Sequence, residues 1–466
     1  MQIAKPQTGV ILALLAVGGC ANFSRDGGFD PVAQATRVHL GKEILWPRTD
    51  GERAKSGAQV AELLSRPLSI DAAVQVALLN NRGLQAAFEQ LGISEADLVQ
   101  AGRLANPRFD FRHTAAAGQY DIEESVSLNV VSLLTMSYRR EIEQRRFAQA
   151  QAGIEQRILE LAQETRSAYV AAVAAHESVA YHEQVNTAAT AGAELARRMV
   201  GAGNWNRIDL ARERAFELDA QQSLERARYV EIASREKLIR LLNLPSTSGA
   251  DTPGTAAPLH LAERLPDLPA AIEALPDVEQ YVLESRVDLQ IERLRLDELA
   301  RSLDLTHSTR FVNVLEAGPA RVKQGSAHAG YESGFVLSFE VPIFDSGAAR
   351  LKRAEAIYAQ ALDAFAQAAI DARSQIRQAY ANYQAAHKLA IQQRDEILPL
   401  RKSIADQNLL RYNASLISIF ELLSSARDQA AGVDDYIQAA RGFWIAKSEF
   451  DAALLGSPGV SRTASW

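Results

Sequence analysis

The side chains best suited to chemistry are eight histidines, one cysteine and the carboxylates, and their spacing predicts no catalytic or metal centre. His176 and His182 are six residues apart in a helical run, which places them on different faces, and His-Glu-x-x-His is absent. Gly201-x-Gly203 lacks a preceding strand and a third glycine, which argues against dinucleotide binding. There is no Walker loop and no nucleophile elbow. We therefore expect a protein that is not an enzyme and binds no cofactor or metal.

The single cysteine, Cys20, is the one residue whose surroundings indicate a covalent modification. Lys5 precedes the eight-residue apolar stretch Val10–Val17, which is too short to span a bilayer, and two glycines then lead into Cys20. This looks like a bacterial lipoprotein signal, whose cysteine is acylated and becomes the first mature residue. An ordinary secretory signal with a chance cysteine is the alternative. Ala21 stands where inner-membrane lipoproteins carry aspartate, which favours sorting to the outer membrane.

Composition narrows the class of protein further. A net charge of −7 argues against nucleic-acid binding, which needs a basic face. One cysteine excludes an intramolecular disulfide framework. No stretch after the signal reaches the roughly 18 apolar residues of a membrane-spanning helix. If the chain crosses a membrane, strands must do so.

The elements that must position any functional side chain are long helices. The run from Met136 to Val200 contains strong helix formers and no proline, and at 1.5 Å per residue it predicts a rod of roughly 97 Å. A corner follows at Gly201–Asn204, and a second helical pattern extends from Asp209 to Leu244. A compact enzyme has no use for such a rod.

This helical hairpin recurs later in the chain, between Ala348 and Leu455. Arg166-Ser-Ala-Tyr169 returns as Arg377-Gln-Ala-Tyr380, 211 residues on, and the first corner falls on Tyr412–Ser415 at the same offset. Heptad positions coincide as well, which is typical of coiled-coil packing. The seam residues are Ile154, Ile158, Leu161, Thr165, Ala168, Ala172, Ala175 and Val179, matched by Phe365, Ala369, Ala372, Ile376, Ala379, Tyr383, Ala386 and Ala390. The sequence therefore predicts two like halves.

Each half also predicts a shorter helix and two strands ahead of its long helix. A helix begins at the N-cap residue Ser69, breaks near Asn80–Gly83 and continues to about Gln100. The matching helix is expected at Val278–Leu305. Apolar and polar residues alternate around Phe109–His113 and Val126–Val130, and again in Phe311–Leu315 and Gly334–Val341. Asn22–Arg66, by contrast, is expected to be irregular.

Four strands per chain have a consequence for assembly. A closed membrane barrel needs about eight strands, and open strand edges are not tolerated in lipid. Three chains would supply about twelve strands and a tube of about twelve stacked helices. The fold class expected is thus mainly α with a small β part, as a homotrimeric α-helical barrel plus a 12-stranded transmembrane β-barrel. Loops joining the strands of a sandwich could give the same alternation.

Three motifs, in this order on the repeat, carry a resemblance. Gly334–Gly347 ends in Pro-Ile-Phe-Asp-Ser-Gly, Arg411–Leu423 surrounds the second corner, and Leu454-Leu455-Gly456 closes the pattern. Together they resemble the TolC-like outer-membrane efflux factor family, over nearly the whole chain from Cys20 to Gly456, as a lipoprotein subtype. The resemblance implies a periplasmic α-barrel conduit capped by a β-barrel in the outer membrane. It also implies docking to a periplasmic adaptor (membrane fusion) protein and an inner-membrane pump.

The chain departs from the family pattern in places. Ser415 replaces the corner glycine, and we expect an αL-tolerant neighbour such as Asn413 to take over its role. The segment Val131–Thr135 lacks the proline and glycine that bracket the second strand pair, which leaves the first strand boundary open. Pro399 stands in the second long helix, where the repeat has Ala188, and predicts a kink.

Charged residues near the corners are the candidates for a gate. Glu421 stands where family members often carry a gate carboxylate, and three copies would form an anionic ring; a solvated helix face is the alternative. Asp209 is a second candidate. Arg207 and Arg411 could tie neighbouring tips together by ion pairs. The candidates for adaptor contact are the corner residues, which also turn the chain: Gly201, Ala202, Gly203, Asn204, Tyr412, Asn413, Ala414 and Ser415.

The expected function is a passive outer-membrane exit duct of a tripartite efflux or secretion system. A lipid-anchored periplasmic coiled-coil scaffold without a pore is the alternative. The expected segments are a signal peptide (1–19), an N-terminal anchor segment (20–66), a first repeat (67–244), a proline-rich linker (245–276), a second repeat (277–456) and a tail (457–466).

Overall fold

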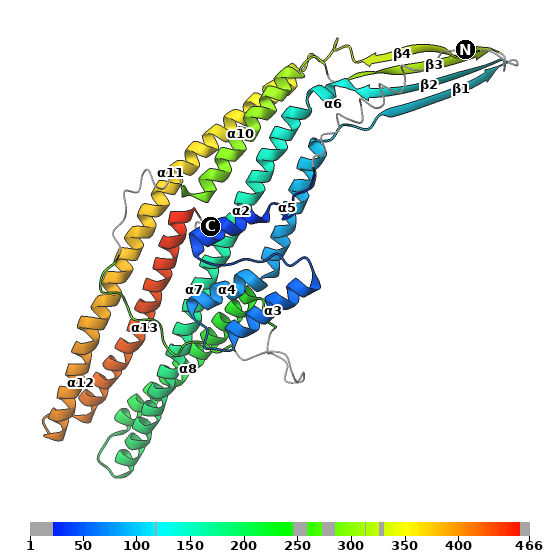
Figure 1. Cartoon of the computed structure of the whole chain (residues 1–466). Helices are drawn as coiled ribbons and strands as arrows, with labels where there is room; N and C mark the ends of the chain where they lie inside the picture. Colours follow the sequence, from blue (N-terminus) through cyan, green and yellow to red (C-terminus); the bar gives the residue numbers. More distant parts are fainter. Residues whose placement is uncertain are drawn as a thin grey trace. The chain divides into compact units, whose positions relative to one another are not determined.

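The computed structural model describes residues 22–116, 119–245, 259–272, 285–312, 314–325 and 330–456. Cys20 with the signal peptide, more than half of the linker, the start of the helix expected at Val278 and the C-terminal tail lie outside these residues. The described chain is mostly helical, with one antiparallel sheet (Figure 1). The mainly α class with a small β part is thereby confirmed.

The described elements are named as in Figure 1. The first half of the chain holds α2 (Phe29–Leu40), α3 (Asp50–Leu64), α4 (Ile70–Asn80), α5 (Arg82–Ala101), β1 (Arg108–Ala116), β2 (Gln119–Asn129), α6 (Val130–Leu134), α7 (Met136–Gly201) and α8 (Arg207–Leu242). The second half holds α10 (Val287–Ser308), β3 (Leu315–Gly325), β4 (Glu332–Phe339), α11 (Ala348–Gln392), the π-helical turn η1 (Gln393–Ile397), α12 (Leu398–Asn413) and α13 (Ile419–Leu455).

The chain folds into two compact units, and each unit draws segments from both halves of the sequence. One unit comprises residues 1–32, 87–154 and 288–369, and it contains the sheet. The other comprises residues 33–86, 155–287 and 370–466, and it contains α8, α12 and α13. None of the described helices has an apolar stretch long enough to cross a bilayer.

The N-terminal region is not irregular, contrary to expectation, because α2 and α3 form there. Thr49 and Glu52 make a reciprocal capping box at the start of α3, a local signal for a helix in a segment that was expected to be irregular. Only Ser56 and Val60 of α3 are buried, which explains its weak apolar periodicity. In α2, Val32, Ala33 and Thr36 are buried.

The predicted heptad seam forms a buried surface. All eight seam residues on α7, from Ile154 to Val179, are buried, and Ala372, Ile376, Tyr383 and Ala390 are buried on α11. Tyr383 stacks with Phe443 and Phe450 of α13, with both pairs of ring centroids 5.5 Å apart. Apolar helical spacing therefore identified correctly the faces on which these long helices pack.

A buried arginine completes the core of the second unit. Arg286, just before α10, is 1% exposed and donates hydrogen bonds to the Ala453 carbonyl at 2.8 Å and to Gln375 Oε1 at 3.0 Å. The Ala453 carbonyl lies in the last turn of α13, where carbonyl groups lack helical partners. Gly456 then ends that helix in the left-handed conformation, as glycine does at many helix C-termini.

Breaks in the helices occur where the sequence predicts them. Ser69 caps α4 by accepting the N–H of Ala72, and α4 ends at Asn80 before α5 begins at Arg82. Near Pro399, the regular α-helix gives way to the π-turn η1, and the proline occupies the first turn of α12. A proline cannot donate the backbone hydrogen bond that a continuous α-helix needs at that position.

The sheet has the strand order β1-β2-β3-β4, and every neighbouring pair is antiparallel. The strand expected at Phe311–Leu315 was placed wrongly, because β3 begins at Leu315 and continues to Gly325. Gly318-Pro319 inside β3 resembles a turn signal, which concealed the strand. At Gly318, an added Cβ would lie 1.8 Å from the carbonyl oxygen of Val126 in β2, so only glycine allows this close approach.

Candidate functional site

The first corner joins α7 to α8 and exposes its four residues to solvent. Gly203 has a φ of +77°, a conformation that suits glycine. The side chain of Asn206 accepts hydrogen bonds from the N–H groups of Ile208 at 2.8 Å and Asp209 at 2.9 Å, which caps α8. The predicted corner at Gly201–Asn204 is therefore a helix-to-helix turn with an accessible backbone.

The second corner joins α12 to α13, and Ser418 caps the new helix by accepting the N–H of Glu421 at 3.3 Å. Ser415 itself takes the left-handed conformation, with a φ of +60°. Asn413 remains the last residue of α12, so the expectation that it would take over this conformation was wrong. A serine in this region is strained relative to glycine, because its Cβ approaches the following carbonyl.

An aromatic contact links the two corners. The rings of Trp205, which follows the first corner, and Phe420, the second residue of α13, have centroids 4.6 Å apart at an interplanar angle of 35°. We did not single out either residue from the sequence. Each is a large aromatic residue beside a turn, where a side chain would be exposed to solvent unless it packed against another group. That position is the feature of the sequence that could have indicated a contact.

A charged contact links the same two hairpins farther from the corners. Nη2 of Arg427 in α13 donates to both carboxylate oxygens of Glu213 in α8, at 2.8 and 2.7 Å. The Glu213 side chain is 2% exposed, and the Arg427 guanidinium also lies 4.1 Å from the ring centroid of Phe216. These three residues line a cavity of about 310 Å³ with parts of α7, including Gly192. No local pattern predicts this pair, since a Glu and an Arg 214 residues apart each have the character of ordinary surface residues.

The predicted gate residues lie at the starts or ends of the corner helices. Glu421 is exposed in the first turn of α13. Asp209, in the first turn of α8, lies 3.7 Å from Arg212. Arg207 and Arg411 are exposed, and neither forms an ion pair within the described part of a single chain. Among the described residues, Trp205–Phe420 and Glu213–Arg427 are contacts near the corners that join the hairpins within one chain, and the four charges chosen from the sequence make no such contact.

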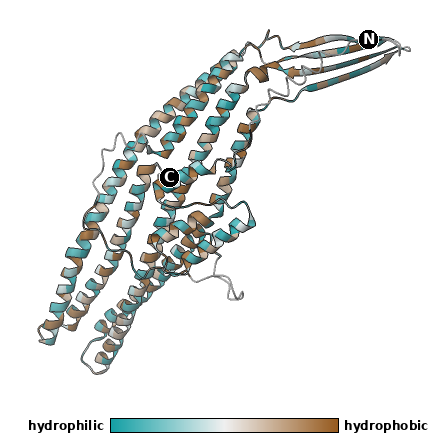
Figure 2. Cartoon of the chain, in the orientation of Figure 1, coloured by the Kyte–Doolittle hydropathy of each residue, from teal (hydrophilic) through white to brown (hydrophobic). Residues whose placement is uncertain are grey.

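The sheet has one apolar face, and its large side chains are exposed. Residues directly opposite each other in antiparallel strands point to the same face, so the register assigns every side chain. Phe335 is 82% exposed, and Figure 2 shows hydrophobic positions along the strands. The exposed apolar residues of this face are Phe109, Phe111, Val126, Phe335, Leu337 and Phe339. An exposed surface of this kind marks contact with a membrane or another protein.

The opposite face of the sheet is polar and acidic. Arg112 and Glu123 lie opposite each other on it and pair at 3.1 Å. The charged residues of this polar face are Arg108, Asp110, Arg112, Asp121, Glu123, Glu316 and Glu332. The polar face thus carries five carboxylates and two guanidinium groups.

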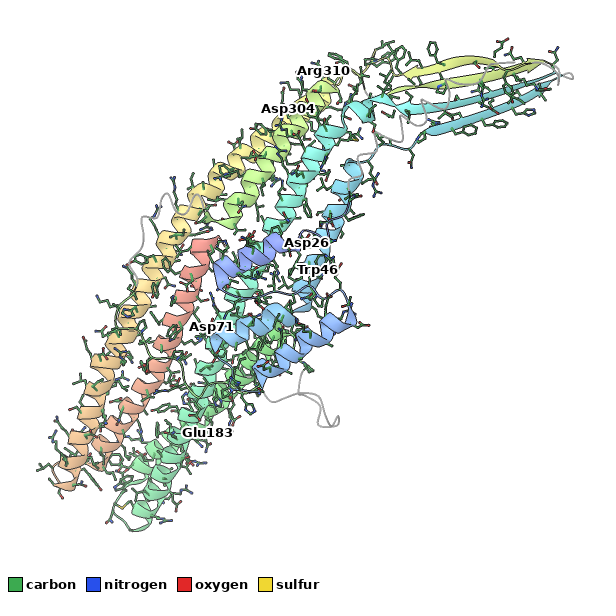
Figure 3. All side chains as sticks on the ribbon, viewed as in Figure 1. Asp26, Trp46, Asp71, Glu183, Asp304 and Arg310 are labelled. Atoms are coloured by element: carbon green, nitrogen blue, oxygen red, sulfur yellow. The ribbon has the colours of Figure 1, made fainter. Side chains whose placement is uncertain are left out.

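The Pro-Ile-Phe-Asp-Ser-Gly segment makes the passage from β4 into α11. Asp345 Oδ1 accepts the N–H of Gly347 at 2.8 Å, and Gly347 has a φ of +71°. An added Cβ there would lie 2.5 Å from the carbonyl oxygen of Arg310, which requires glycine. Arg310, labelled in Figure 3, follows α10 and donates from Nε to the Ser346 carbonyl at 3.1 Å. The segment therefore holds the chain that leads into β3 against the chain that leaves β4.

The first strand pair leaves the sheet differently. β2 ends at Asn129, whose side chain accepts the N–H of Ser132 and caps the one-turn helix α6. The boundary that the sequence left open is therefore at Asn129. Asparagine is a favoured N-cap residue, so α6 forms without a proline or glycine.

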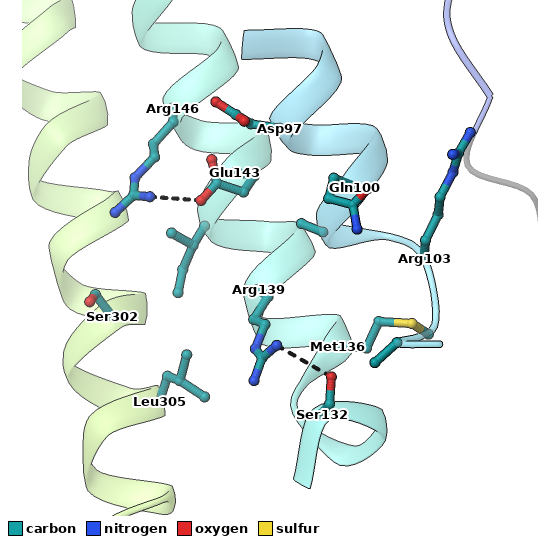
Figure 4. A pocket seen from close by; sticks show the side chains of 13 residues that line it. Asp97, Gln100, Arg103, Ser132, Met136, Arg139, Glu143, Arg146, Ser302 and Leu305 are labelled. Carbon is teal, nitrogen blue, oxygen red and sulfur yellow. Dashed lines mark hydrogen bonds and ion pairs between the residues drawn. The ribbon is translucent and has the colours of Figure 1, made fainter. Parts of the chain in front are cut away.

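A polar cavity of about 630 Å³ lies among α5, α7 and α10 (Figure 4). Arg146 pairs there with Glu143 at 2.7 Å and with Glu298 at 2.9 Å, and Arg139 donates to Ser132 at 3.3 Å. These pairs involve Arg146, Glu143 and Arg139, and the residues that line the cavity include no nucleophile with an adjacent base. Across the described residues, no group of three His, Cys, Asp or Glu side chains could hold a metal ion.

Comparison with known proteins finds likeness in structure only. No family model matches the chain, and no curated protein matches it either. Among solved structures, the outer-membrane channel OprN is 18% identical, with a TM-score of 0.68, and the match covers 91% of this chain and 95% of OprN.

Two further solved structures are similar. The CmeC outer membrane channel of Campylobacter jejuni is 14% identical over 89% of each chain, with a TM-score of 0.66. The open state of the MtrE outer membrane channel of Neisseria gonorrhoeae is 15% identical over 84% of this chain and 90% of MtrE, with a TM-score of 0.66. The chain has the fold of these outer-membrane channels.

Proposed function

We propose that this chain is one protomer of an outer-membrane exit channel that carries small molecules or ions passively from the periplasm to the exterior. The proposal identifies it as a lipoprotein member of the TolC-like efflux factor family. It places the sheet in the outer membrane and the long helices in the periplasm.

The observation that carries this proposal is the two-faced sheet. Its exposed apolar residues, such as Phe335 and Phe339, share one face, while five carboxylates share the other. In water such a surface is unfavourable by about 25 cal/mol for each Å² of apolar area, whereas in lipid it is the normal outer wall of a barrel. The polar face would then line an aqueous passage.

The free edges of the sheet support a trimer. β1 and β4 are the outer strands of the described sheet, and each presents one unpaired backbone ladder. Pairing β4 of one chain with β1 of the next is antiparallel and satisfies both ladders. Three chains close a barrel of twelve strands, which is above the minimum of about eight.

The corners are proposed as the part of the channel that opens and that binds the adaptor. Opening would separate the α7–α8 and α12–α13 hairpins, within each chain and between neighbouring chains, when a periplasmic adaptor docks on the exposed corner residues. Glu421, repeated three times around the axis, would form an anionic constriction, with Asp209, Arg207 and Arg411 beside it. An inner-membrane pump would supply the energy, and acyl chains on Cys20 would anchor the protein in the outer membrane.

Oligomeric mass and conductance test the proposal together. In detergent the protein should have the mass of a trimer, and in a planar bilayer it should conduct ions. Monomers that do not conduct would contradict the channel and favour a lipid-anchored periplasmic scaffold. The scaffold gives no reason for an exposed apolar sheet face.

A further inference from the structure

The outer end of the sheet carries a group of basic and aromatic side chains that the exit-channel proposal does not use. We call Arg321, Lys323, His113, Tyr120 and Tyr331 the basic-aromatic cluster. It lies where β1 and β3 end and where β2 and β4 begin, whereas the opposite ends of β2 and β4 lead to α6 and α11. Figure 1 shows α6 at the opposite end of the strands.

The side chains of this cluster contact one another. Lys323 Nζ lies 5.6 Å from the ring centroid of Tyr120 and 5.7 Å from that of Tyr331. The guanidinium carbon of Arg321 lies 5.7 Å from the Tyr331 ring, and the rings of His113 and Tyr120 stack at 6.3 Å. Such cation–π contacts hold the cations beside the rings without neutralising their charge.

The cluster lies on the apolar face of the sheet. His113 is opposite Ile122, which is opposite Lys323, and Phe111 is opposite Glu124, which is opposite Arg321. Phe335 and Phe339 are on the same face, nearer the helices. The cations therefore share a face with the side chains assigned to lipid.

Charge is separated between the two faces at this end. Among the described strand residues, the apolar face at this end carries Arg321, Lys323 and one carboxylate, Glu124, which lies 3.7 Å from Arg321. Since a guanidinium has five N–H donors, one carboxylate leaves Arg321 capacity for another anion. The polar face at the same level has Arg112 against three carboxylates, Asp121, Glu123 and Glu332. Within the described strands at this end, formal charge is thus positive on the apolar face and negative on the polar face.

The height of the cluster fits the edge of a membrane. From Leu315 to Lys323 the strand is roughly 26 Å long at about 3.3 Å per residue, which at a barrel tilt of about 40° spans roughly 20 Å of an apolar band about 25 Å tall. Aromatic residues and the long stems of Lys and Arg concentrate at this boundary, with their polar ends toward lipid head groups.

We propose that the basic-aromatic cluster binds the phosphate groups of a phosphorylated glycolipid in the outer leaflet. Lys323 and Arg321 pair with the phosphates, Tyr120 and Tyr331 donate hydrogen bonds to head-group oxygens, and the acyl chains lie along Phe335, Leu337 and Phe339. The proposal rests on the sheet being the membrane-spanning part of the exit channel.

The test measures the affinity of the purified protein for diphosphorylated lipid A. The double variant Arg321→Gln, Lys323→Gln should bind about 30-fold more weakly, because each cation near an anionic lipid surface contributes about 1 kcal/mol. The matched control is Arg112→Gln, which removes a cation at the same level of the polar face and should leave lipid affinity within twofold. The charge-preserving variant Arg321→Lys, Lys323→Arg should also bind normally. Unchanged affinity in the double glutamine variant overturns the proposal.

A second arm uses the unsubstituted chain, so it does not depend on how the variants fold. Removing the phosphates from lipid A should lower its affinity, while phosphatidylglycerol vesicles and inorganic phosphate should compete poorly. If phosphatidylglycerol competes with lipid A as well as lipid A itself does, the cluster binds ordinary phospholipid. That result would overturn the proposal of a glycolipid site. Conductance of the same chain in a phospholipid bilayer separates the two proposals. A conducting trimer without glycolipid preference contradicts only the cluster, whereas a chain that neither inserts nor conducts contradicts the exit channel.

Discussion

Glu213 in α8 and Arg427 in α13 form a buried ion pair, in which one guanidinium nitrogen donates to both carboxylate oxygens at 2.8 and 2.7 Å. The carboxylate is 2% exposed, so it depends on this partner for its charge to be tolerated. The pair joins the two helical hairpins of one chain behind the corners. It therefore opposes any motion that separates them.

Arg427→Met should destabilise the protein by about 3 kcal/mol, because it leaves the buried Glu213 carboxylate without its partner. Thermal unfolding in detergent measures the loss, and bilayer recordings should show more frequent opening. The matched control is Arg212→Met, whose pairing with Asp209 spans 3.7 Å at an exposed site and should be worth less than about 1 kcal/mol. Equal effects of the two substitutions would contradict a role for the buried pair.

Glu421→Gln should weaken the preference of the channel for cations, because three neutral amides would replace three carboxylates at the constriction. The reversal potential in a salt gradient measures this preference. Asp219→Asn, an exposed carboxylate on α8, is the control and should leave the potential unchanged. An unaltered potential in Glu421→Gln would assign this residue to a solvated helix face.

Ser415→Gly should stabilise the protein by about 1 kcal/mol, since serine pays a steric cost at a φ of +60° that glycine does not. Ala414→Gly is the matched control, because Ala414 has a φ of −82° and glycine there only adds freedom to the unfolded chain. The two neighbouring substitutions should therefore shift the melting temperature in opposite directions. A shift in the same direction would show that the turn does not have this geometry.

Asp434→Asn should reduce stability at neutral pH by about 1 kcal/mol. The His182 imidazole, 3.6 Å away, is the largest cause of the lowered pKa of Asp434; the hydrogen bond from Ser178 at 2.9 Å adds to it, and burial opposes both. A carboxyl group with a lowered folded-state pKa stabilises above its ordinary value of 3.8 and loses this contribution as the pH falls through the folded value.

The gap in stability between the unsubstituted chain and Asp434→Asn should accordingly close below pH 3.8. Circular dichroism melts across acidic pH measure it. Asp435→Asn, the exposed neighbour that pairs with Arg401 at 3.3 Å, is the control and should show little change. A gap that persists at the lowest pH would rule out titration of Asp434 as its source.

Cys20→Ser should abolish incorporation of labelled palmitate, because a serine hydroxyl does not replace the acylated thiol. Ala21→Asp is the matched control: it should keep the label but move the protein to the inner membrane. Undiminished labelling in Cys20→Ser would contradict the lipid anchor. Together the two variants distinguish acylation, which depends on Cys20, from sorting between membranes, which depends on the adjacent Ala21.

The helical part of the fold could be predicted well because its signals are local. Heptad spacing identified residues such as Ile158 and Ile376, which are fully buried, and Ser69 was identified as an N-cap. The corners were also placed correctly, since Gly203 and the Asn-Ala-Ser sequence interrupt helical periodicity. Helix α3 was not predicted, because it buries only two side chains and has no clear apolar stripe. Its stability depends more on its capping box.

The candidate site was predicted less completely. The position of β3 was not predicted because Gly318-Pro319 is typical of a turn. In the structure, Gly318 is required by the close approach of the Val126 backbone in β2. Ser415 was not expected to adopt a left-handed conformation, which the turn from α12 into α13 nevertheless imposes. No local pattern marks Glu213 and Arg427 as partners.

By itself, the sequence determined the periodic features of this protein: long helices, their buried seams, the alternating strands and the corners between helices. These follow from side-chain spacing along one element, which the sequence displays directly. Only the tertiary structure decided which corner residues meet, which carboxylate is buried with an arginine, and which strand side chains share a face. Such contacts join residues far apart in the chain, so their energy depends on a register and a burial that no local spacing contains.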